Sequence, residues 1–459
     1  MLLTKDKSFY KNLFLLALPI ALQNLVTFAV GFADNVMISG LGDNAISGVY
    51  MANQIQTLLQ LMSGGIEGAI LVLGAQYWGK RDTESVRRIA SIGVRASVVF
   101  GVLLTIVCFF FPRTVISFFT NKPEIIDTGA DFLKIVCFSY GFFCLTQALI
   151  ASQRCVETAR VGLYVSLCSL CIDVALNYLL IFGKLGLPAL GIKGAAIATL
   201  VARICESAII VIYTLIVDKK LCFKVKDLFV TDKDLLKDLI RYGAPIVAGQ
   251  LVWAINMLSN SAIMGRQTQD GVVAALSIAN TMHNLAYVTM NGMSNAVGII
   301  TGKTIGAGKE EKMKEYAKTV QILFITLGLV TGLGLQLLKM PFISLYSVSD
   351  AAVKQAISLI NVISVTIIGT CYQAACLFGL VKSGGDISFV FKNDCIFVFG
   401  IVLPSAIIAT LLGAPAWVVF ACLKSDQILK CFVAVVKINR FNWMKNLTRQ
   451  SSNQQEAEA

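Results

Sequence analysis

Long apolar stretches recur along the whole chain, and they constrain its fold more than any other feature. Twelve such segments can be delimited, near residues 13–38, 46–74, 89–112, 128–150, 161–182, 192–217, 242–264, 272–300, 319–339, 353–379, 393–412 and 415–436. Each is close to the ~20 residues that a transmembrane helix needs. Only 14% of the residues are charged, against about 25% in soluble domains. The sequence therefore predicts an all-α polytopic membrane protein with 12 transmembrane helices.

Basic residues are concentrated in alternate connections between these segments. The connections after the second, fourth, sixth, eighth and tenth segments, together with both termini, hold most of the 39 Lys and Arg. Because basic loops stay in the cytoplasm, we expect a multi-pass plasma-membrane protein with both termini cytoplasmic. The same rule accounts for the net charge of +12, so nucleic acid is not an expected partner. The polar tail, residues 442–459, is expected to be cytoplasmic and disordered beyond Trp443, an interfacial anchor.

The longest polar connection, residues 218–241, divides the segments into two groups of six. Pro19 corresponds to Pro245 and Asp34 to Asn260, a spacing of 226 in both cases (245 − 19 and 260 − 34). Asn53 with Asn280, Gly65 with Gly292, Gly79 with Gly306 and Gln147 with Gln373 keep this register to within one residue. Such agreement indicates an internal repeat. Since six is an even number, both halves start on the same side of the membrane and the repeats are parallel.

The repeat predicts two six-helix bundles, an N-terminal one over residues 1–217 and a C-terminal one over 242–441, with 218–241 as a cytoplasmic linker. Transporters built from such halves bind substrate in the cleft between them and alternate the side to which the cleft opens.

Acidic residues inside the apolar segments are the candidates for ion coupling. Asp34 lies in the first segment, Glu67 in the second, and Asp173 and Asn177 in the fifth. A carboxylate at the centre of a membrane helix costs roughly 2.5–3.5 kcal/mol on insertion scales, and such acids usually carry ions or protons. Asp173 and Asn177 are four residues apart and project from one helix face. With Asp34 they would form an oxygen-rich pocket suited to Na⁺ or to a proton.

Each of these assignments has a structural alternative. Asp34 could lie near the membrane surface, Glu67 could lie at the interface, and Asp173 could simply hydrogen-bond a neighbouring helix. Arg203 and Glu206 are three residues apart and are expected to pair with each other in a mainly structural role.

The second half is poorer in acids and richer in neutral polar groups. The residues expected to line a substrate cavity are Gln54, Gln250, Asn256, Asn260, Asn280 and His283. Interhelical hydrogen bonding would explain any one of the amides equally well. His283 is the only histidine; it could titrate near neutral pH, although a plain hydrogen-bonding role fits it too. The unequal distribution of acids suggests that the first half handles the coupling ion.

Two other chemistries fit the sequence poorly. Gly298–Thr304 resembles a phosphate-binding loop, but Val297 stands where that motif requires glycine, and no strand precedes it. No nucleophile lies beside a base in an arrangement typical of a hydrolase. The protein is therefore predicted not to be an enzyme, with no cofactor, nucleotide or obligate protein partner, and an ion gradient is the expected energy source.

Several segments together are similar to the multidrug and toxic compound extrusion (MATE) family of secondary transporters. They are LPI and FADNVMISGLG in the first segment, ALNYLLIFGKLGLPALGIKGAAIAT across the fifth and sixth, and APIVAGQLVWAINM and GKTIGAGKEEKMKEYA in the second half. The resemblance implies antiport of organic, usually cationic, compounds against H⁺ or Na⁺. It also implies a first-half cation site, where Asp34 takes the helix 1 position and Asp173 and Asn177 take the helix 5 pair in reversed order. Thr199 is implied as a further ligand.

Trp253 occupies the position at which another branch of that family carries an acid in helix 7, so no second-half cation site is expected. The leading hypothesis is a cation-coupled antiporter that exports small organic, cationic compounds (multidrug efflux) by alternating access. The alternatives are a flippase of a lipid-linked precursor or an exporter of one dedicated metabolite. A flippase would favour a strongly cationic cavity, whereas few basic residues, among them Arg203, Lys424 and Lys430, lie within the segments.

Overall fold

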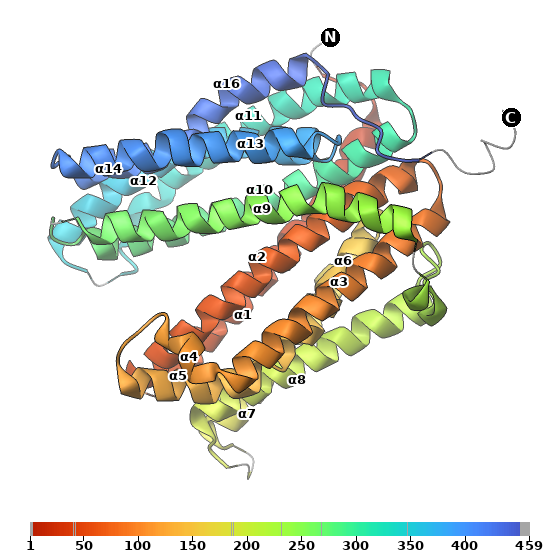
Figure 1. Ribbon diagram of the computed structural model, residues 1–459. Coiled ribbons are helices and arrows are strands. Elements are labelled where there is room, and N and C mark those ends of the chain that lie inside the picture. The colour runs from red at the N-terminus through yellow and green to blue at the C-terminus, as the bar shows by residue number, and fades with distance from the viewer. Residues whose placement is uncertain are drawn as a thin grey trace, which may run out of the picture. The chain divides into compact units, whose positions relative to one another are not determined.

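The computed structural model describes residues 3–39, 41, 43–184, 186, 188–230, 232–267, 269–346 and 348–449. Over these residues the protein is helical throughout (Figure 1). The first half contains α1 (Lys7–Ser39), α2 (Asp43–Gly79), α3 (Thr83–Phe110), α4 (Pro112–Ser117), α5 (Pro123–Val136), α6 (Ser139–Cys155), α7 (Arg160–Phe182), α8 (Gly191–Ile212), η1 (Tyr213–Val217) and η2 (Val225–Phe229). The second half contains α9 (Lys233–Gly265), α10 (Val272–Gly306), α11 (Glu310–Ile343), α12 (Asp350–Gln373), η3 (Ala374–Lys382), α13 (Ile387–Phe397), η4 (Val398–Val402), α14 (Leu403–Leu411), α15 (Ala416–Leu423) and α16 (Asp426–Asn439).

The helices account for all of the predicted membrane segments. Within the described residues, nine helices are long and apolar enough to cross a membrane, and the pair α5 and α6, bent by 53°, would make ten. The two remaining predicted segments fall on α10, which carries several polar side chains, and on the broken pair α15 and α16. The prediction of an all-α, multi-span protein is therefore confirmed.

Local sequence explains where several helices begin, end or bend. Pro123 stands at the first turn of α5, where its missing N–H removes no helical hydrogen bond. Ser349 caps α12 by accepting a hydrogen bond from the backbone N–H of Ala352 at 3.3 Å. Gly183 ends α7 in the left-handed conformation, with φ of 64°. Three long helices continue through a proline, at Pro19 in α1, at its repeat partner Pro245 in α9, and at Pro341 near the end of α11.

The described contacts divide the chain into two compact units. Unit 1 comprises Met1–Ala21, Ala75–Asp82 and Ala248–Ala459, and unit 2 comprises Leu22–Gly74 and Thr83–Val247. The boundaries fall inside α1, α2 and α9, so each of these helices contributes residues to both units. A contact made by one end of such a helix therefore belongs to a different unit from a contact made by its other end.

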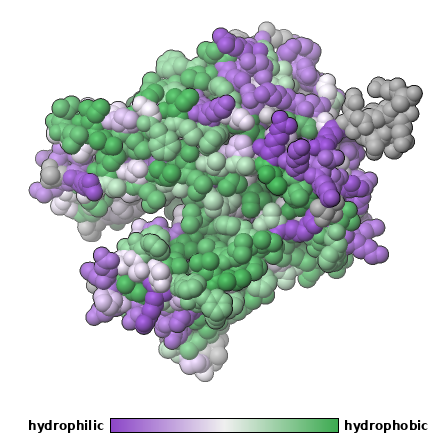
Figure 2. All heavy atoms as spheres, in the orientation of Figure 1, coloured by the Kyte–Doolittle hydropathy of each residue, from purple (hydrophilic) through white to green (hydrophobic). Residues whose placement is uncertain are grey.

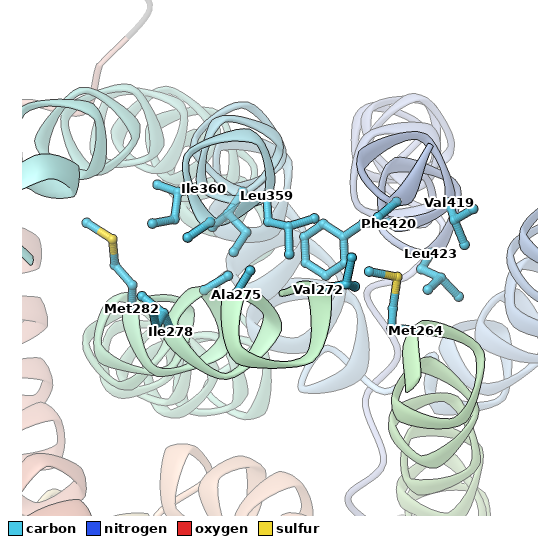
Figure 3. Close-up of a cluster of buried hydrophobic side chains, with 14 of the residues drawn as sticks. Met264, Val272, Ala275, Ile278, Met282, Leu359, Ile360, Val419, Phe420 and Leu423 are labelled. Atoms are coloured by element: carbon cyan, nitrogen blue, oxygen red, sulfur yellow. The ribbon is translucent and has the colours of Figure 1, made fainter. Parts of the chain in front are cut away.

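Each unit is packed around its own apolar cluster. In unit 1, Met264 of α9, Val272 of α10, Leu359 of α12 and Phe420 of α15 belong to one buried cluster (Figure 3). In unit 2, a second cluster includes Tyr140 of α6, which is fully buried. These clusters hold the helices together from the inside, as in a soluble bundle.

The outside of the helices is also apolar. Phe110, Ile216 and Leu337 expose 68%, 77% and 79% of their surface. On the face seen in Figure 2, hydrophobic side chains cover the sides of the helices and hydrophilic ones gather towards helix ends. Exposed apolar surface on this scale would be unfavourable in water, but it suits helices whose sides face lipid.

The start of the C-terminal tail differs from its prediction. Trp443 is fully buried, its Nε1–H donates to the carbonyl oxygen of Ile438 at 3.0 Å, and its ring fills the space beside Gly384, which has no side chain. Beyond it, the backbone N–H of Lys445 donates to the carbonyl of Gly384 at 2.7 Å. The prediction that Trp443 is an interfacial anchor is therefore wrong. The prediction of disorder directly after it is wrong for residues 444–449, because this stretch packs against the turn before α13. Residues 450–459 lie outside the described residues.

Candidate functional site

Three of the predicted polar residues meet inside unit 2. Asn177 of α7 donates through Nδ2 to Oδ1 of Asp34 of α1 at 2.8 Å and to Oδ2 of Asp173 at 3.1 Å. The carboxyl groups of Asp34 and Asp173 also lie within electrostatic reach of each other. One amide nitrogen therefore bridges two carboxylates that come from two helices.

The positions of these residues on their helices explain the arrangement. Asp173 and Asn177 are one helical turn apart and project from the same face of α7, as their spacing predicts. Both are 1% exposed. Asp34 lies five residues before the end of α1 at Ser39, but its carboxylate is directed at α7 and is half-buried. Its place near a helix end therefore does not put its charge at the protein surface.

The hydrogen bonding of this trio leaves only acceptors unused. The Asn177 amide has two N–H donors, and both carboxylates draw on them. Among the described residues, Oδ1 of Asp173 and Oδ1 of Asn177 are buried and have no hydrogen-bond partner. Buried acceptors without a donor are costly. A hard cation or a proton would satisfy them, because carboxylate and amide oxygens are the ligands such a cation prefers.

The charge around the trio is negative overall. On α8, Nη1 of Arg203 pairs with Oε2 of Glu206 at 2.5 Å, which confirms the predicted pair. The Arg203 guanidinium also lies within electrostatic reach of Asp34 and Asp173. Three carboxylates and one guanidinium leave a formal charge of −2, and this charge attracts a cation into the interior of the unit.

The remaining first-half candidates lie apart from these contacts. Thr199 is half-buried on α8 and makes no hydrogen bond to the trio in the described part of the chain. Glu67 of α2 accepts a hydrogen bond from Oγ of Ser63 at 3.2 Å and lies within electrostatic reach of Arg154. Arg154 is buried and donates to Oε1 of Gln23 at 2.8 Å. Glu67 therefore belongs to a second polar group of unit 2.

The residues predicted to line a substrate cavity are distributed over both units. Gln54 belongs to unit 2, and Gln250, Asn256, Asn260, Asn280 and His283 belong to unit 1. Nδ2 of Asn260 donates to the carbonyl oxygen of Asn256 at 2.9 Å and to its Oδ1 at 3.3 Å, so these two amides bind each other. His283 stacks on Tyr287 with ring centroids 6.1 Å apart.

Sequence reasoning missed two acids in unit 1. Asp394 of α13 and Asp426 of α16 both bind the ammonium group of Lys430, at 2.8 and 3.1 Å. The signal was present, because both acids lie in or beside apolar segments, as Asp34 does.

The family comparison agrees with the repeat. The MatE family model matches residues 19–179 and again residues 245–405. The two matches start 226 positions apart (245 − 19), which is the register of the repeat read from the sequence.

Known proteins resemble the chain along most of its length. An uncharacterised transporter, YisQ, of Bacillus subtilis is 26% identical over 412 residues, with 87% of both chains covered. A probable multidrug resistance protein NorM of Thermotoga maritima is 25% identical and covers 73% of this chain and 72% of its own. A solved multidrug resistance MATE family transporter of the MOP superfamily, in an outward-facing conformation, is 19% identical. It has a TM-score of 0.84 and covers 96% of this chain and 99% of its own.

A second solved structure is that of a MOP superfamily transporter from Pyrococcus furiosus, whose binding pocket has a reverse polarity that suggests a different function. It is 20% identical, has a TM-score of 0.83 and covers 96% of this chain and 99% of its own. This shared fold has 12 helices in two six-helix bundles. With the family model matching both halves, the chain belongs to the MatE family and is a multi-pass membrane transporter of small molecules, not an enzyme.

Proposed function

We propose that the protein is an antiporter that exports small organic compounds by alternating access and that takes up H⁺ or Na⁺ at Asp34, Asp173 and Asn177. The observation that supports this proposal is the amide of Asn177 bridging two carboxylates, with two buried oxygens left without a partner. The formal charge of −2 around these oxygens supplies the attraction for a cation.

Cation uptake would change the contact between α1 and α7. A proton on Asp34, or Na⁺ between the carboxylates, competes with the Asn177 amide for the same oxygens. The α1 segment after residue 21 would then pack differently on α7, while the segment before it, with Pro19, belongs to unit 1. Transport requires only that cation and substrate favour different access states of the protein.

The proposal extends to the other predicted residues and to topology. Glu67 and Thr199 would tune the coupling site from α2 and α8, and the cavity residues of α2, α9 and α10 would contact substrate. The chain would lie in the plasma membrane with both termini cytoplasmic, because its basic connections lie on one side. Residues 1–217 and 242–441 would act as the two halves, joined by the linker 218–241.

Multidrug efflux is the substrate range that the relatives favour. The NorM protein of Thermotoga maritima is named a probable multidrug resistance protein, and cationic compounds are the expected cargo from the family resemblance. The Pyrococcus furiosus transporter, which has the same fold, has a binding pocket of reverse polarity. The fold alone therefore does not determine the charge of the substrate, which has to be measured. A lipid-linked precursor or one dedicated metabolite is the competing cargo.

Transport by purified protein in liposomes tests the proposal. Ethidium efflux would be driven by a pH gradient alone or by a Na⁺ gradient alone, with wild type beside Asp34→Asn and a matched control, Glu310→Gln, at an exposed position of α11. We expect one gradient to drive transport, Asp34→Asn to abolish it, and the control to match wild type. Full coupled transport by Asp34→Asn would refute the coupling site. A wild type that moves no dye under either gradient would favour the dedicated-metabolite or flippase alternatives.

A further inference from the structure

Unit 1 contains a groove between α13 and α16 that the proposed coupling site does not use. The two helices contact each other (Figure 1). The groove has a volume of about 480 Å³, within the roughly 300–1,000 Å³ of small-molecule sites. It is lined by Phe389 of α13, by Phe432, Val433, Val436 and Lys437 of α16, and by Arg440 and Asn442 after the end of α16.

One part of the groove is apolar and faces outward. Phe432 and Val436 are 68% and 53% exposed, and their spacing of four places both on one face of α16. Both belong to the last predicted membrane segment, residues 415–436. Phe389, near the start of α13, adds a half-buried aromatic ring. This part of the groove therefore offers apolar surface to the hydrocarbon of a bilayer.

The other part of the groove is basic. Lys437 and Arg440 follow the last predicted membrane segment and lie three residues apart, on one face of the chain. Nζ of Lys437 lies 2.6 Å from Oδ2 of Asp386, and Nζ of Lys445 lies 2.8 Å from Oδ1 of the same acid. Arg440 is exposed and has no ion-pair partner among the described residues. These three basic groups and one carboxylate carry a formal charge of +2.

The basic part has donors available for a phosphate group. The Arg440 guanidinium presents five N–H donors in a fork that matches the geometry of a phosphate. Lys437 keeps N–H donors beyond the one that faces Asp386. No carboxylate is among the described residues that line the groove, so the ammonium group of a zwitterionic headgroup would find no acidic partner there. An anionic headgroup therefore fits the groove better than a zwitterionic one.

The order of these residues along α16 suits a lipid better than a soluble ligand. The apolar residues of α16 end at position 436 and the basic ones begin at 437, so the groove crosses from hydrocarbon to headgroup level. Basic pockets between membrane helices at that level bind anionic headgroups. Residues 450–459 lie outside the described residues. Their only apolar side chains are alanines, so Glu456 and Glu458 match the basic part of the groove but nothing in this tail matches the apolar part.

We propose that this groove binds an anionic phospholipid of the surrounding bilayer. Its phosphate would lie at Arg440 and Lys437, and one acyl chain would lie along Phe432 and Val436. The site would select lipids by headgroup charge, which a purely apolar helix surface cannot do. This inference goes beyond the proposed transport function and depends neither on the coupling site nor on the cargo.

Competition between two lipids for purified protein in detergent tests the inference. Phosphatidylglycerol and phosphatidylcholine with identical acyl chains would be added in equal amounts, and the lipid retained by the protein would be counted by native mass spectrometry. We expect wild type to retain phosphatidylglycerol about fivefold or more over phosphatidylcholine, since one basic residue near an anionic membrane surface contributes about 1 kcal/mol. Arg440→Gln should remove most of this preference, and Arg440→Lys should keep it.

Two further variants separate the headgroup from the acyl chain. Phe432→Ala should weaken the retention of both lipids and leave the preference unchanged, because it removes apolar surface and no charge. Arg160→Gln is the matched control, because Arg160 is also an exposed arginine at the end of a long apolar helix and does not line the groove. It should behave as wild type.

Several results would overturn the inference. Wild type that retains both lipids equally, or neither, has no anionic lipid site. A preference that survives Arg440→Gln, or that Arg160→Gln reduces as much, reflects only the overall positive charge of the protein. Unchanged retention of both lipids by Phe432→Ala, or displacement of phosphatidylglycerol by an equal concentration of glycerol 3-phosphate, would show that no acyl chain lies in the groove. Much stronger retention after Glu456→Gln with Glu458→Gln would assign the basic part to the C-terminal tail.

Discussion

Asp173→Asn isolates the contribution of charge to the proposed coupling site. The substitution keeps the size and shape of the side chain and leaves an oxygen ligand in place, but it reduces the formal charge around the trio from −2 to −1. The hydrogen bonds that Asn177 makes to Asp34 and to residue 173, at 2.8 and 3.1 Å, place both acceptor oxygens around one nitrogen atom. A cation bound by these oxygens would therefore be close to both charge centres.

The size of the effect follows from Coulomb's law. A cation about 4 Å from a carboxylate gains about 4 kcal/mol at an effective dielectric constant of 20. Loss of that attraction corresponds to about a thousandfold weaker cation binding, since 1.4 kcal/mol is a factor of ten. Relaxation of the neutral amide towards the cation would reduce the loss, so a hundredfold to thousandfold range is expected.

The assay is substrate transport in proteoliposomes as a function of the coupling-cation concentration, after the driving gradient has been identified. We expect the half-saturating cation concentration of Asp173→Asn to rise by roughly 10²- to 10³-fold. Asp131→Asn is the matched control, because Asp131 is 54% exposed and makes a surface ion pair with Lys193 at 3.3 Å. A cation dependence of Asp173→Asn equal to that of wild type would refute the electrostatic reasoning, even if maximal transport fell.

Three further predictions concern stability, read as the thermal unfolding of purified protein. Gly306→Ala would place a methyl group against a backbone carbonyl of α2 within unit 1 and should cost about 1–3 kcal/mol of stability. Gly334→Ala is its control, because the space at the Cβ of Gly334 is open, and it should be neutral or stabilising. Equal effects of the two substitutions would contradict the close packing at Gly306. Lys430→Met should cost about 3–5 kcal/mol, because it removes the buried ammonium group that pairs with two half-buried carboxylates. An unchanged unfolding temperature would rule out a stabilising role for this pairing. Burial raises the pKa of Asp386, but hydrogen bonds from two lysines outweigh burial and hold this pKa below the ordinary 3.8. The stabilising effect of the Asp386 carboxylate is therefore present above pH ~4 and lost as the pH falls through the folded-state pKa. Asp386→Asn should lower stability at pH 7 and weaken the acid dependence of stability below pH ~4, and an unaltered pH profile would contradict this assignment.

The sequence by itself was enough to determine the helices and their repeat. Backbone groups in hydrocarbon must bond within their own segment, so a long apolar run has no alternative to a helix. Each of the twelve predicted segments falls on one to three consecutive helical elements. The 226-residue register was readable because the two halves keep a proline and several glycines at corresponding positions. The shared face of Asp173 and Asn177 followed from helical geometry alone.

Only the tertiary structure decided which of the polar residues meet. Asn177 binds Asp34 across 143 positions of sequence, whereas Glu67 pairs with a different group. The spacing within a helix fixes which side chains share a face, but the partner of that face depends on how whole helices cross and pack. The same reason explains how Lys430 pairs with Asp394 of α13 as well as with Asp426 of its own helix. Trp443 reads as an interfacial residue in sequence, and it is buried because Gly384, far from it along the chain, leaves room for its ring.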